Sequence, residues 1–154
     1  MKIFCDLRKC TGCKSCEIAC AVEHSFSKDL VKALRESVPP TKRVRIRDSF
    51  GRAVRISCQH CEEAPCVAAC MSGAMYKDPK TGATKHDKDK CVGCWMCIMV
   101  CPFGAIVRSI EDKQALKCDL CPDRDDYACV IACPTGALFA GTPEEFKRKA
   151  EKKL

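Results

Sequence analysis

The chain has 154 residues, of which 17 are cysteine and only 6% are aromatic. This length suits one domain or two very small ones, and so few aromatic side chains leave little apolar burial to offset chain entropy, so bound metal is expected to contribute to folding. The cysteines cluster in fours and residues 1–8 lack the apolar run of a signal peptide, which argues against a secreted disulfide scaffold. No apolar stretch is long enough to span a membrane, and a cytoplasmic location is expected.

The chain begins with residues 2–7, whose weak alternation predicts a short strand. Cys5 lies in this strand and fits no ligand spacing, so it is interpreted as a packed small hydrophobe. The first cysteine run follows with the spacing C-x2-C-x2-C-x3-C, and it consists of Cys10, Cys13, Cys16 and Cys20. Gly12 is expected to supply the tight turn of this loop.

Residues 25–51 form an insertion without cysteine. Ser27 is predicted to cap a short helix with Leu30, Val31 and Leu34 on one face. Residues 43–47 and 54–57 alternate on either side of a turn at 48–51, which predicts a hairpin. Its basic outward face is either a docking surface for a partner or a solvated edge.

Three more runs follow. The second has the spacing C-x2-C-x4-C-x3-C, the third repeats the first and is followed by proline, and the fourth has a wide central gap. Their members are Cys58, Cys61, Cys66 and Cys70; Cys91, Cys94, Cys97 and Cys101; and Cys118, Cys121, Cys129 and Cys133. Residues 76–84 predict a turn between two short strands.

An internal repeat, C-x-x-G-A-apolar, starts at the last cysteine of runs two, three and four. Each copy predicts a one-turn helix that ends at glycine and leads into a short strand. The chain closes with a capping box at residues 142–145, with proline in the first helical position, which predicts a basic helix over 142–154.

The third run matches the bacterial ferredoxin pattern, in which three thiolates bind one [4Fe–4S] cluster and the fourth ligates a different cluster. Sixteen cysteines in four such groups predict four clusters. Zinc is the alternative, but zinc sites usually pair two C-x2-C knuckles and do not need cysteine triplets. With sixteen thiolates and four cubane cores of about +2 each, the formal charge of +7 falls to about −1. A nucleic-acid partner is therefore not expected.

The side chains outside these runs provide no recognisable catalytic set. His60 lies between Cys58 and Cys61 and is expected to donate a hydrogen bond to cluster sulfur rather than act as a ligand. No Ser-His-Asp set, phosphate loop or flavin fingerprint is visible, so no enzymatic activity is expected.

The order of the four runs, with wider third gaps in runs two and four, resembles the four-cluster iron–sulfur subunits of redox enzymes such as dimethyl sulfoxide reductase. Residues 118–129 and the short chain most resemble the CooF-type subunit that pairs with carbon monoxide dehydrogenase. The resemblance implies that run one pairs with run four, and run two with run three. The implied ligand sets are Cys10, Cys13, Cys16 and Cys133; Cys118, Cys121, Cys129 and Cys20; Cys58, Cys61, Cys66 and Cys101; and Cys91, Cys94, Cys97 and Cys70.

The resulting expectation is an α+β protein of two ferredoxin-like double-cluster modules, interleaved in sequence within a single domain, 1–154. The outer module is 1–24 with 111–141, the inner module is 52–110, and an insertion (25–51) and a C-terminal helix (142–154) complete the chain.

The expected function is electron transfer between a catalytic metalloenzyme subunit, with carbon monoxide dehydrogenase favoured, and a second partner such as a hydrogenase or a flavin NAD(P) oxidoreductase. The alternatives are a subunit of a tungsten or molybdenum aldehyde or formate oxidoreductase, a hydrogenase subunit, and a free-standing polyferredoxin. No membrane insertion is expected, although peripheral association through a partner stays open.

Overall fold

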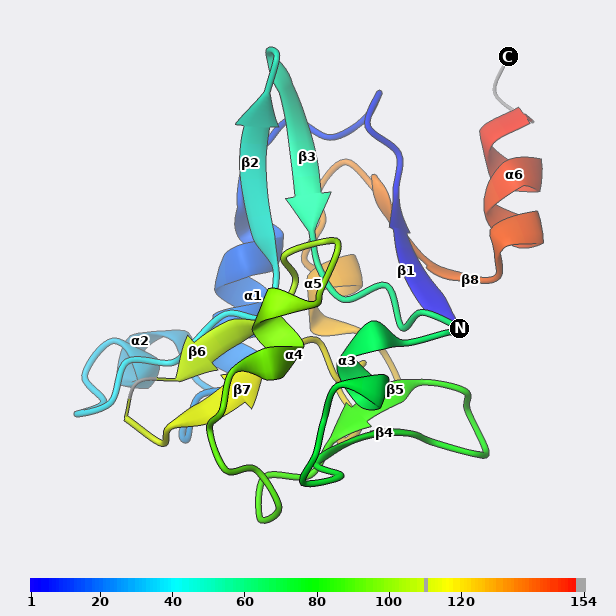
Figure 1. The fold of residues 1–154 in the computed structure, drawn as a ribbon. Helices are drawn as coiled ribbons and strands as arrows, with labels where there is room; N and C mark the ends of the chain where they lie inside the picture. The colour runs from blue at the N-terminus through cyan, green and yellow to red at the C-terminus, as the bar shows by residue number, and fades with distance from the viewer. Residues whose placement is uncertain (110, 152–154) are drawn as a thin grey trace. The chain divides into compact units, whose positions relative to one another are not determined.

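The computed structural model describes residues 1–109 and 111–151 as a small mixed α/β protein of short elements, none longer than nine residues (Figure 1). The chain separates into two units: unit 1 comprises Met1–Arg55 and Cys121–Leu154, and unit 2 comprises Ile56–Leu120. The strands form separate two-stranded pairs. No helix in the described residues combines the length and the apolar character needed to cross a lipid bilayer.

In unit 1 the two ends of the chain pair with each other. Strand β1 (Lys2–Cys5) runs antiparallel to β8 (Leu138–Gly141), with Lys2 opposite Gly141. The strand predicted over residues 2–7 is therefore confirmed, but it ends at Cys5. Beyond it, one more hydrogen bond joins the two segments, from the N–H of Asp6 to the Ala137 carbonyl (2.8 Å).

Helix α6 (Pro143–Glu151) confirms the predicted capping box. The backbone N–H of Thr142 donates to the Glu145 carboxylate (2.8 Å), and the N–H of Glu145 donates to the Thr142 hydroxyl (3.3 Å). Phe146 stacks on Phe4 of β1 at 5.0 Å between ring centroids, which fastens the helix to the terminal strand pair. The last part of the predicted helix, 152–154, lies outside the described residues.

The insertion corrects one prediction. Helix α2 (Leu30–Ala33) is capped by Asp29, whose side chain accepts the N–H groups of Val31 and Lys32, and not by Ser27. The Ser27 hydroxyl instead donates to the Glu36 carboxylate (2.6 Å). The prediction of Ser27 as the helix cap was wrong because α2 starts two residues later than expected.

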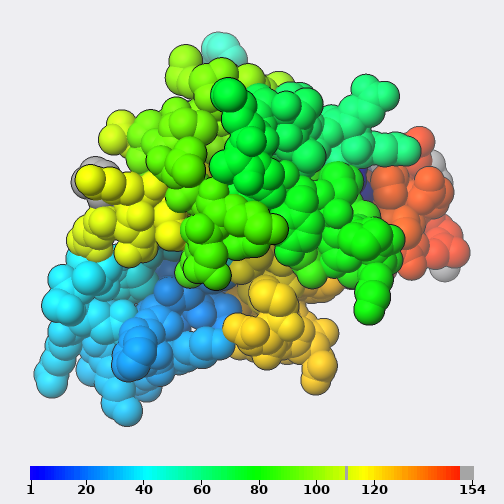
Figure 2. Space-filling model, turned by 60° about the horizontal axis from the view of Figure 1, so that its bottom comes forward, coloured from blue at the N-terminus to red at the C-terminus, as the bar shows by residue number. Residues whose placement is uncertain are grey.

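The apolar face predicted for this helix is also not a packing face. Leu30, Val31 and Leu34 are all exposed, Leu34 to 81%, and only Ala33 is buried. A four-residue helix is too short to turn one continuous stripe toward a core. In Figure 2 this segment, in light blue, forms part of the surface of the face viewed.

The predicted hairpin is confirmed as β2 (Arg45–Ser49) and β3 (Arg52–Ile56), joined by Phe50 and Gly51 (Figure 1). Its base is tied to helix α1 (Ser15–Glu23). The buried Glu17 carboxylate accepts the N–H of Ile46 and pairs with the ammonium of Lys42. Burial alone would raise the pKa of Glu17, but these two donors hold it below its ordinary value.

Unit 2 consists of two antiparallel strand pairs and two short helices. The pairs are β4 (Met75–Lys77) with β5 (Thr84–His86), and β6 (Val107–Ser109) with β7 (Gln114–Leu116). Helix α3 (Pro65–Ala68) packs against both α4 (Met96–Met99) and β4. The pair β4–β5 confirms two short strands joined by a turn, but the turn is shorter than the predicted 76–84, because β4 extends to Lys77 and β5 begins at Thr84.

The internal repeat corrects part of one prediction. A hydrogen-bonded turn, and not a one-turn helix, follows the last cysteine of each of these runs, whereas the glycine and the strand after it are placed as predicted. In each copy glycine adopts a positive φ, and its N–H donates to the carbonyl of the run's last cysteine at 3.1–3.2 Å. The three glycines are Gly73, Gly104 and Gly136. Each turn leads into a strand, β4, β6 or β8, and short helices α3, α4 and α5 (Ala128–Ile131) precede the three turns.

Candidate iron–sulfur sites

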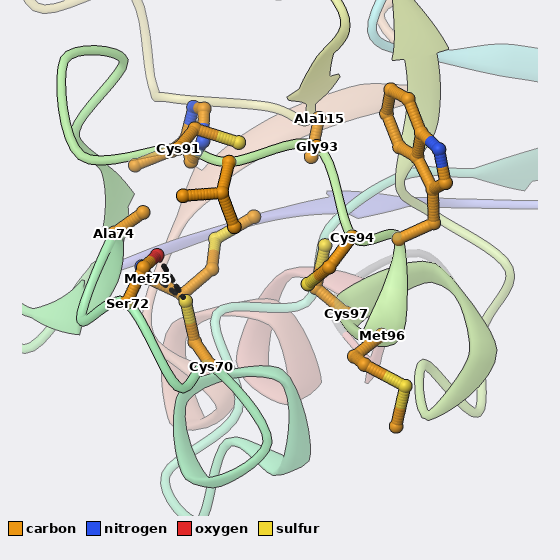
Figure 3. A pocket seen from close by; sticks show the side chains of 13 residues that line it. Cys70, Ser72, Ala74, Met75, Cys91, Gly93, Cys94, Met96, Cys97 and Ala115 are labelled. Carbon is orange, nitrogen blue, oxygen red and sulfur yellow. Dashed lines mark hydrogen bonds between the residues drawn. The ribbon is translucent and has the colours of Figure 1, made fainter.

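In unit 2, four cysteines line one small cavity, termed here the Cys91 cavity. Figure 3 shows Cys91, Cys94 and Cys97 around it together with Cys70, the last cysteine of another run. Gly93 and Trp95 both take positive φ, 67° and 65°, which closes the backbone into the tight loop that carries the three consecutive cysteines. Cys94 is solvent-exposed, whereas Cys97, on α4, is buried.

In unit 1, a second small cavity, the Cys10 cavity, is likewise lined by three cysteines of one run and one cysteine of another. Its walls include Cys10, Cys13 and Cys16 and the last cysteine of the fourth run, Cys133. The loop geometry repeats that of the Cys91 cavity, since Gly12 has φ 70° and Lys14, which begins α1, has φ 62°.

Several of these sulfur atoms accept hydrogen bonds that favour the thiolate, the form that ligates metal. The N–H of Met75 lies 3.3 Å from Cys70 Sγ, and the Ser72 hydroxyl lies 3.6 Å from it. Burial opposes the shift, but these groups lower the pKa of Cys70. The Ser15 hydroxyl, 3.4 Å from the exposed Cys13, lowers the pKa of that thiol too.

A third group in unit 2 consists of Cys58, Cys66 and Cys101, termed the Cys58 group. Burial raises the pKa of Cys58 and of Cys66, and both lie close enough to Cys101 for its charge to raise their pKa further. Cys101 Sγ accepts the N–H of Ala105 (3.5 Å). The fourth predicted member, Cys61, has its backbone carbonyl bound by the ammonium of Lys77 (2.6 Å).

Two of the cysteines predicted to share a cluster with Cys118, namely Cys20 and Cys129, lie on packed helices of unit 1. Cys20 lies on α1, and Cys129 lies on α5, which packs against α1. The Arg55 guanidinium lies 3.8 Å from Cys129 Sγ, and the N–H of Arg43 donates to Cys20 Sγ (3.3 Å). Cys118 itself belongs to unit 2, two residues before the boundary.

Two buried polar side chains near the Cys58 group, His60 and Lys117, indicate whether the surroundings of this group suit a bound cluster. His60 is 4% exposed, and neither ring nitrogen has a hydrogen-bond partner among the described residues. Burial, and then the charge of Lys117, lowers its pKa to about 3, so the ring is neutral and one nitrogen carries a proton. A buried donor without an acceptor costs about 1–3 kcal/mol, so an acceptor such as a cluster sulfur fits this position.

The second side chain is Lys117, which is 3% exposed. Its ammonium donates to the backbone carbonyls of Thr84 and Cys118 and has no carboxylate partner among the described residues. Sequence reasoning did not single out Lys117. A lysine precedes the first cysteine of a run three times, at residues 9, 90 and 117, and nothing local distinguishes the buried one.

The described residues contain no three Cys, His, Asp or Glu side chains that converge as ligands of a single metal ion. In a [4Fe–4S] cluster each iron takes one protein thiolate, so its four ligands stand around the cluster. The donor set of the Cys91 and Cys10 cavities, thiols that surround a cavity, is the set that such a cluster uses.

The sequence comparisons agree with this donor chemistry. A family model described as "4Fe-4S dicluster domain" matches residues 52–142, more than half of the chain. The chain therefore belongs to the family of 4Fe-4S dicluster proteins, and its cysteines bind [4Fe–4S] clusters.

Curated relatives are similar over most of their length. An "Iron-sulfur protein" of Rhodospirillum rubrum is 40% identical over 152 residues, which cover 88% of this chain and 79% of the relative. "Electron transport protein HydN" of Escherichia coli K12 is 35% identical over 89% of this chain and 85% of its own. "Thiosulfate reductase electron transfer subunit PhsB" of Salmonella typhi is 36% identical over 91% and 74%.

One solved structure has a related fold. It is titled "Active site complex BamBC of Benzoyl Coenzyme A reductase in complex with Benzoyl-CoA", and the match covers 98% of this chain and 86% of that chain with a TM-score of 0.51. At 22% identity this likeness concerns the fold alone.

Proposed function

We propose that this protein relays electrons through four [4Fe–4S] clusters between a catalytic redox subunit and a second redox partner, and performs no bond chemistry of its own. The observation that carries the proposal is the composition of the two cavities. In each, three cysteines of one run meet the last cysteine of a different run. That exchange is the ferredoxin arrangement, in which the fourth thiolate serves a neighbouring cluster.

The proposed ligand sets follow the same exchange. They are Cys10, Cys13, Cys16 and Cys133; Cys118, Cys121, Cys129 and Cys20; Cys58, Cys61, Cys66 and Cys101; and Cys91, Cys94, Cys97 and Cys70. Residues 1–24 with 111–141 would then form one double-cluster module, and residues 52–110 the other. A bound cluster supplies one-electron redox chemistry. The N–H of Met75, which donates to Cys70 Sγ, and the N–H of Ala105, which donates to Cys101 Sγ, would each tune the potential of the cluster that this cysteine binds.

The favoured catalytic partner is a carbon monoxide dehydrogenase, on the strength of the resemblance to CooF-type subunits. A reductase is the alternative, since a relative is named as an electron transfer subunit of thiosulfate reductase. A diffusing carrier is the third candidate, because HydN is named only as an electron transport protein. The second partner would be a hydrogenase or a flavin NAD(P) oxidoreductase, and the proposed location is cytoplasmic, with any membrane association provided by a partner.

Metal analysis tests the core of this proposal. Protein isolated anaerobically should contain about sixteen iron and sixteen sulfide per chain, four of each per cluster. A value near eight would reject the four-cluster assignment, and stoichiometric zinc in freshly isolated protein would reject iron–sulfur chemistry.

Affinity purification of tagged chain from its native host tests the partner. Recovery with carbon monoxide dehydrogenase supports the favoured assignment, recovery with another large metalloenzyme replaces it, and recovery of the chain alone favours the carrier. In each case dithionite-reduced protein should pass electrons to the recovered enzyme.

A further inference from the structure

Lys117 is a buried cation that has no carboxylate partner in the described part of the chain. Its ammonium has three N–H donors, and two of them are used by the carbonyls of Thr84 and Cys118. No carboxylate lies within ion-pair distance of Lys117 in residues 1–109 and 111–149, and the side chain is 3% exposed. One donor and one full positive charge are therefore left inside unit 2.

Such a charge is costly unless an anion is close, since burying an unpaired ion costs several kcal/mol even after relaxation. The packing around Lys117 identifies the anion. Lys117 lies two residues after Ala115 of β7, and Ala115 is buried in the same core cluster as Cys66, with Cys101 packed against that cluster. The Lys117 charge also acts on the Cys58 and Cys66 thiols, where it opposes the rise in pKa that burial causes. Lys117 therefore faces the Cys58 group, and four thiolates around a cubane core of about +2 leave a net charge of about −2 at that place.

We propose that Lys117 is the fixed counter-charge of the cluster held by Cys58, Cys61, Cys66 and Cys101, and that it raises the reduction potential of this cluster. The inference rests on the proposed cluster assignment. Reduction adds one electron to a group that is already negative. A positive charge beside it in a low-dielectric interior stabilises the reduced form more than the oxidised form.

The same dipeptide elsewhere in unit 2 provides a matched control. Lys90 also precedes the first cysteine of a run, Cys91, but its side chain is 64% exposed and pairs with Asp87 at 3.4 Å. Solvent and this carboxylate screen its charge from the Cys91 cavity. The two lysines therefore differ in burial and pairing while they share their place in the sequence pattern.

The experiment compares Lys117→Met with Lys90→Met in the full, cluster-loaded chain. Midpoint potentials are measured by anaerobic redox titration followed by electron paramagnetic resonance, and iron is assayed in parallel. Lys117→Met should make the reduction equilibrium of one cluster at least tenfold less favourable, about 59 mV for one electron. Lys90→Met should leave every midpoint at its wild-type value. The affected signal should be the one that disappears in Cys66→Ala.

Two further variants cover the case in which Lys117→Met loses the cluster. Lys117→Gln keeps a hydrogen-bond donor without the charge, and Lys117→Arg keeps the charge. A lower midpoint in the Gln variant with near wild-type behaviour in the Arg variant supports the counter-charge. A wild-type midpoint in the Gln or Met variant, with full iron content, overturns it and leaves the four clusters untouched. Wild-type protein with only about eight irons would instead reject the proposed function itself.

Discussion

The Cys10 cavity of unit 1 and the Cys91 cavity of unit 2 are built from the same loop, yet different elements follow the two loops. Both loops place glycine before the second cysteine, Gly12 and Gly93, and both begin their helix at a residue with positive φ. After the loop, however, α1 continues for nine residues, Ser15–Glu23, and α4 for only four, Met96–Met99.

The difference has a local cause. Cys101 is followed by Pro102, which has no N–H for a helical bond and disfavours helical geometry at Cys101, and then by Gly104 with φ 55°. Cys20 is followed by Ala21-Val22-Glu23, which contains neither residue. Cys70 lacks the proline, but α3 still ends after four residues and Gly73 turns the chain. A glycine turn after the last cysteine of the run is thus the feature shared by the segments that follow the three short helices, and the segment after Cys20 lacks it.

The longer helix has a second consequence. It packs on α5 and carries the buried Glu17, which binds the base of the β2–β3 hairpin. One ferredoxin-type loop therefore also anchors an insertion, whereas the helix of its counterpart in unit 2, α4, packs against α3 and leads toward the strand β6.

The largest effect is expected from removal of ligands in pairs. Under the proposed ligand sets, Cys133→Ala and Cys10→Ala should each lower iron from about sixteen to about twelve. The double variant should also hold about twelve, because the proposal assigns both residues to one cluster. Combining Cys10→Ala with Cys20→Ala should leave about eight. If Cys10→Ala with Cys133→Ala fell to eight instead, Cys133 would belong to another cluster. Iron and sulfide assays on anaerobic protein provide the measurement.

The two loop glycines should respond unequally to alanine. A Cβ on Gly93 would lie 2.4 Å from the Lys113 carbonyl oxygen, whereas a Cβ on Gly12 would meet only the Ala53 Cβ at 3.2 Å. Both have positive φ. Gly93→Ala should therefore cost about 3 kcal/mol of unfolding free energy, from backbone strain plus a steric clash, and Gly12→Ala about 1 kcal/mol. Anaerobic urea unfolding measures both, and equal losses would contradict the geometry.

Proline at the position after the first run should shorten α1. Ala21→Pro removes an interior helical hydrogen bond and creates a clash with the preceding turn, at a cost of about 3 kcal/mol. Pro102→Ala, the reverse change in unit 2, should cost less than about 1 kcal/mol, since Gly104 still ends the turn. Circular dichroism should show helix loss for Ala21→Pro alone. If the spectrum and the free energy of unfolding were unchanged, the helical conformation of residues 21–23 would not contribute to stability.

The anchor Glu17 should make stability depend on pH. Its pKa is depressed in the folded protein, so its contribution is present above the unfolded pKa of about 4.3 and is lost as the pH falls through the folded value. Glu17→Gln should cost about 1–2 kcal/mol at pH 7, where the charge-assisted bonds to Ile46 and Lys42 are intact. The gap between wild type and variant in urea unfolding should stay constant down to about pH 5 and narrow below about pH 4. If the difference in unfolding free energy between wild type and Glu17→Gln stayed constant below pH 4 as well, the Glu17 carboxylate would be excluded as the source of that difference.

The smallest effect is expected at Cys5, which lies on β1 next to the Cys10 cavity. Burial first, and then the neighbouring Cys10, raise its pKa to about 12, so it remains a thiol at neutral pH. Cys5→Ala should leave iron content and the reduced electron paramagnetic resonance spectrum unchanged. Loss of about four irons would mean that Cys5 is a ligand after all.

Much of this protein could be read from its sequence because the relevant signals are local. The four cysteine runs, the C-x-x-G-A turns, the hairpin around residues 48–51 and the capping box at Thr142 all depend on residues within a few positions of one another. Ligand spacing and turn chemistry act over that same range, so the class of cofactor and the short elements follow from the pattern.

Other features were decided only by tertiary structure. The cap of α2 is Asp29 and not Ser27, and the apolar side chains Leu30, Val31 and Leu34 of that segment are exposed. Among three Lys-Cys dipeptides, only Lys117 is buried without a carboxylate partner in the described residues. Burial and electrostatic environment depend on which segments pack together, and one neighbour of Lys117, Thr84, lies 33 positions away. No local pattern carries that information.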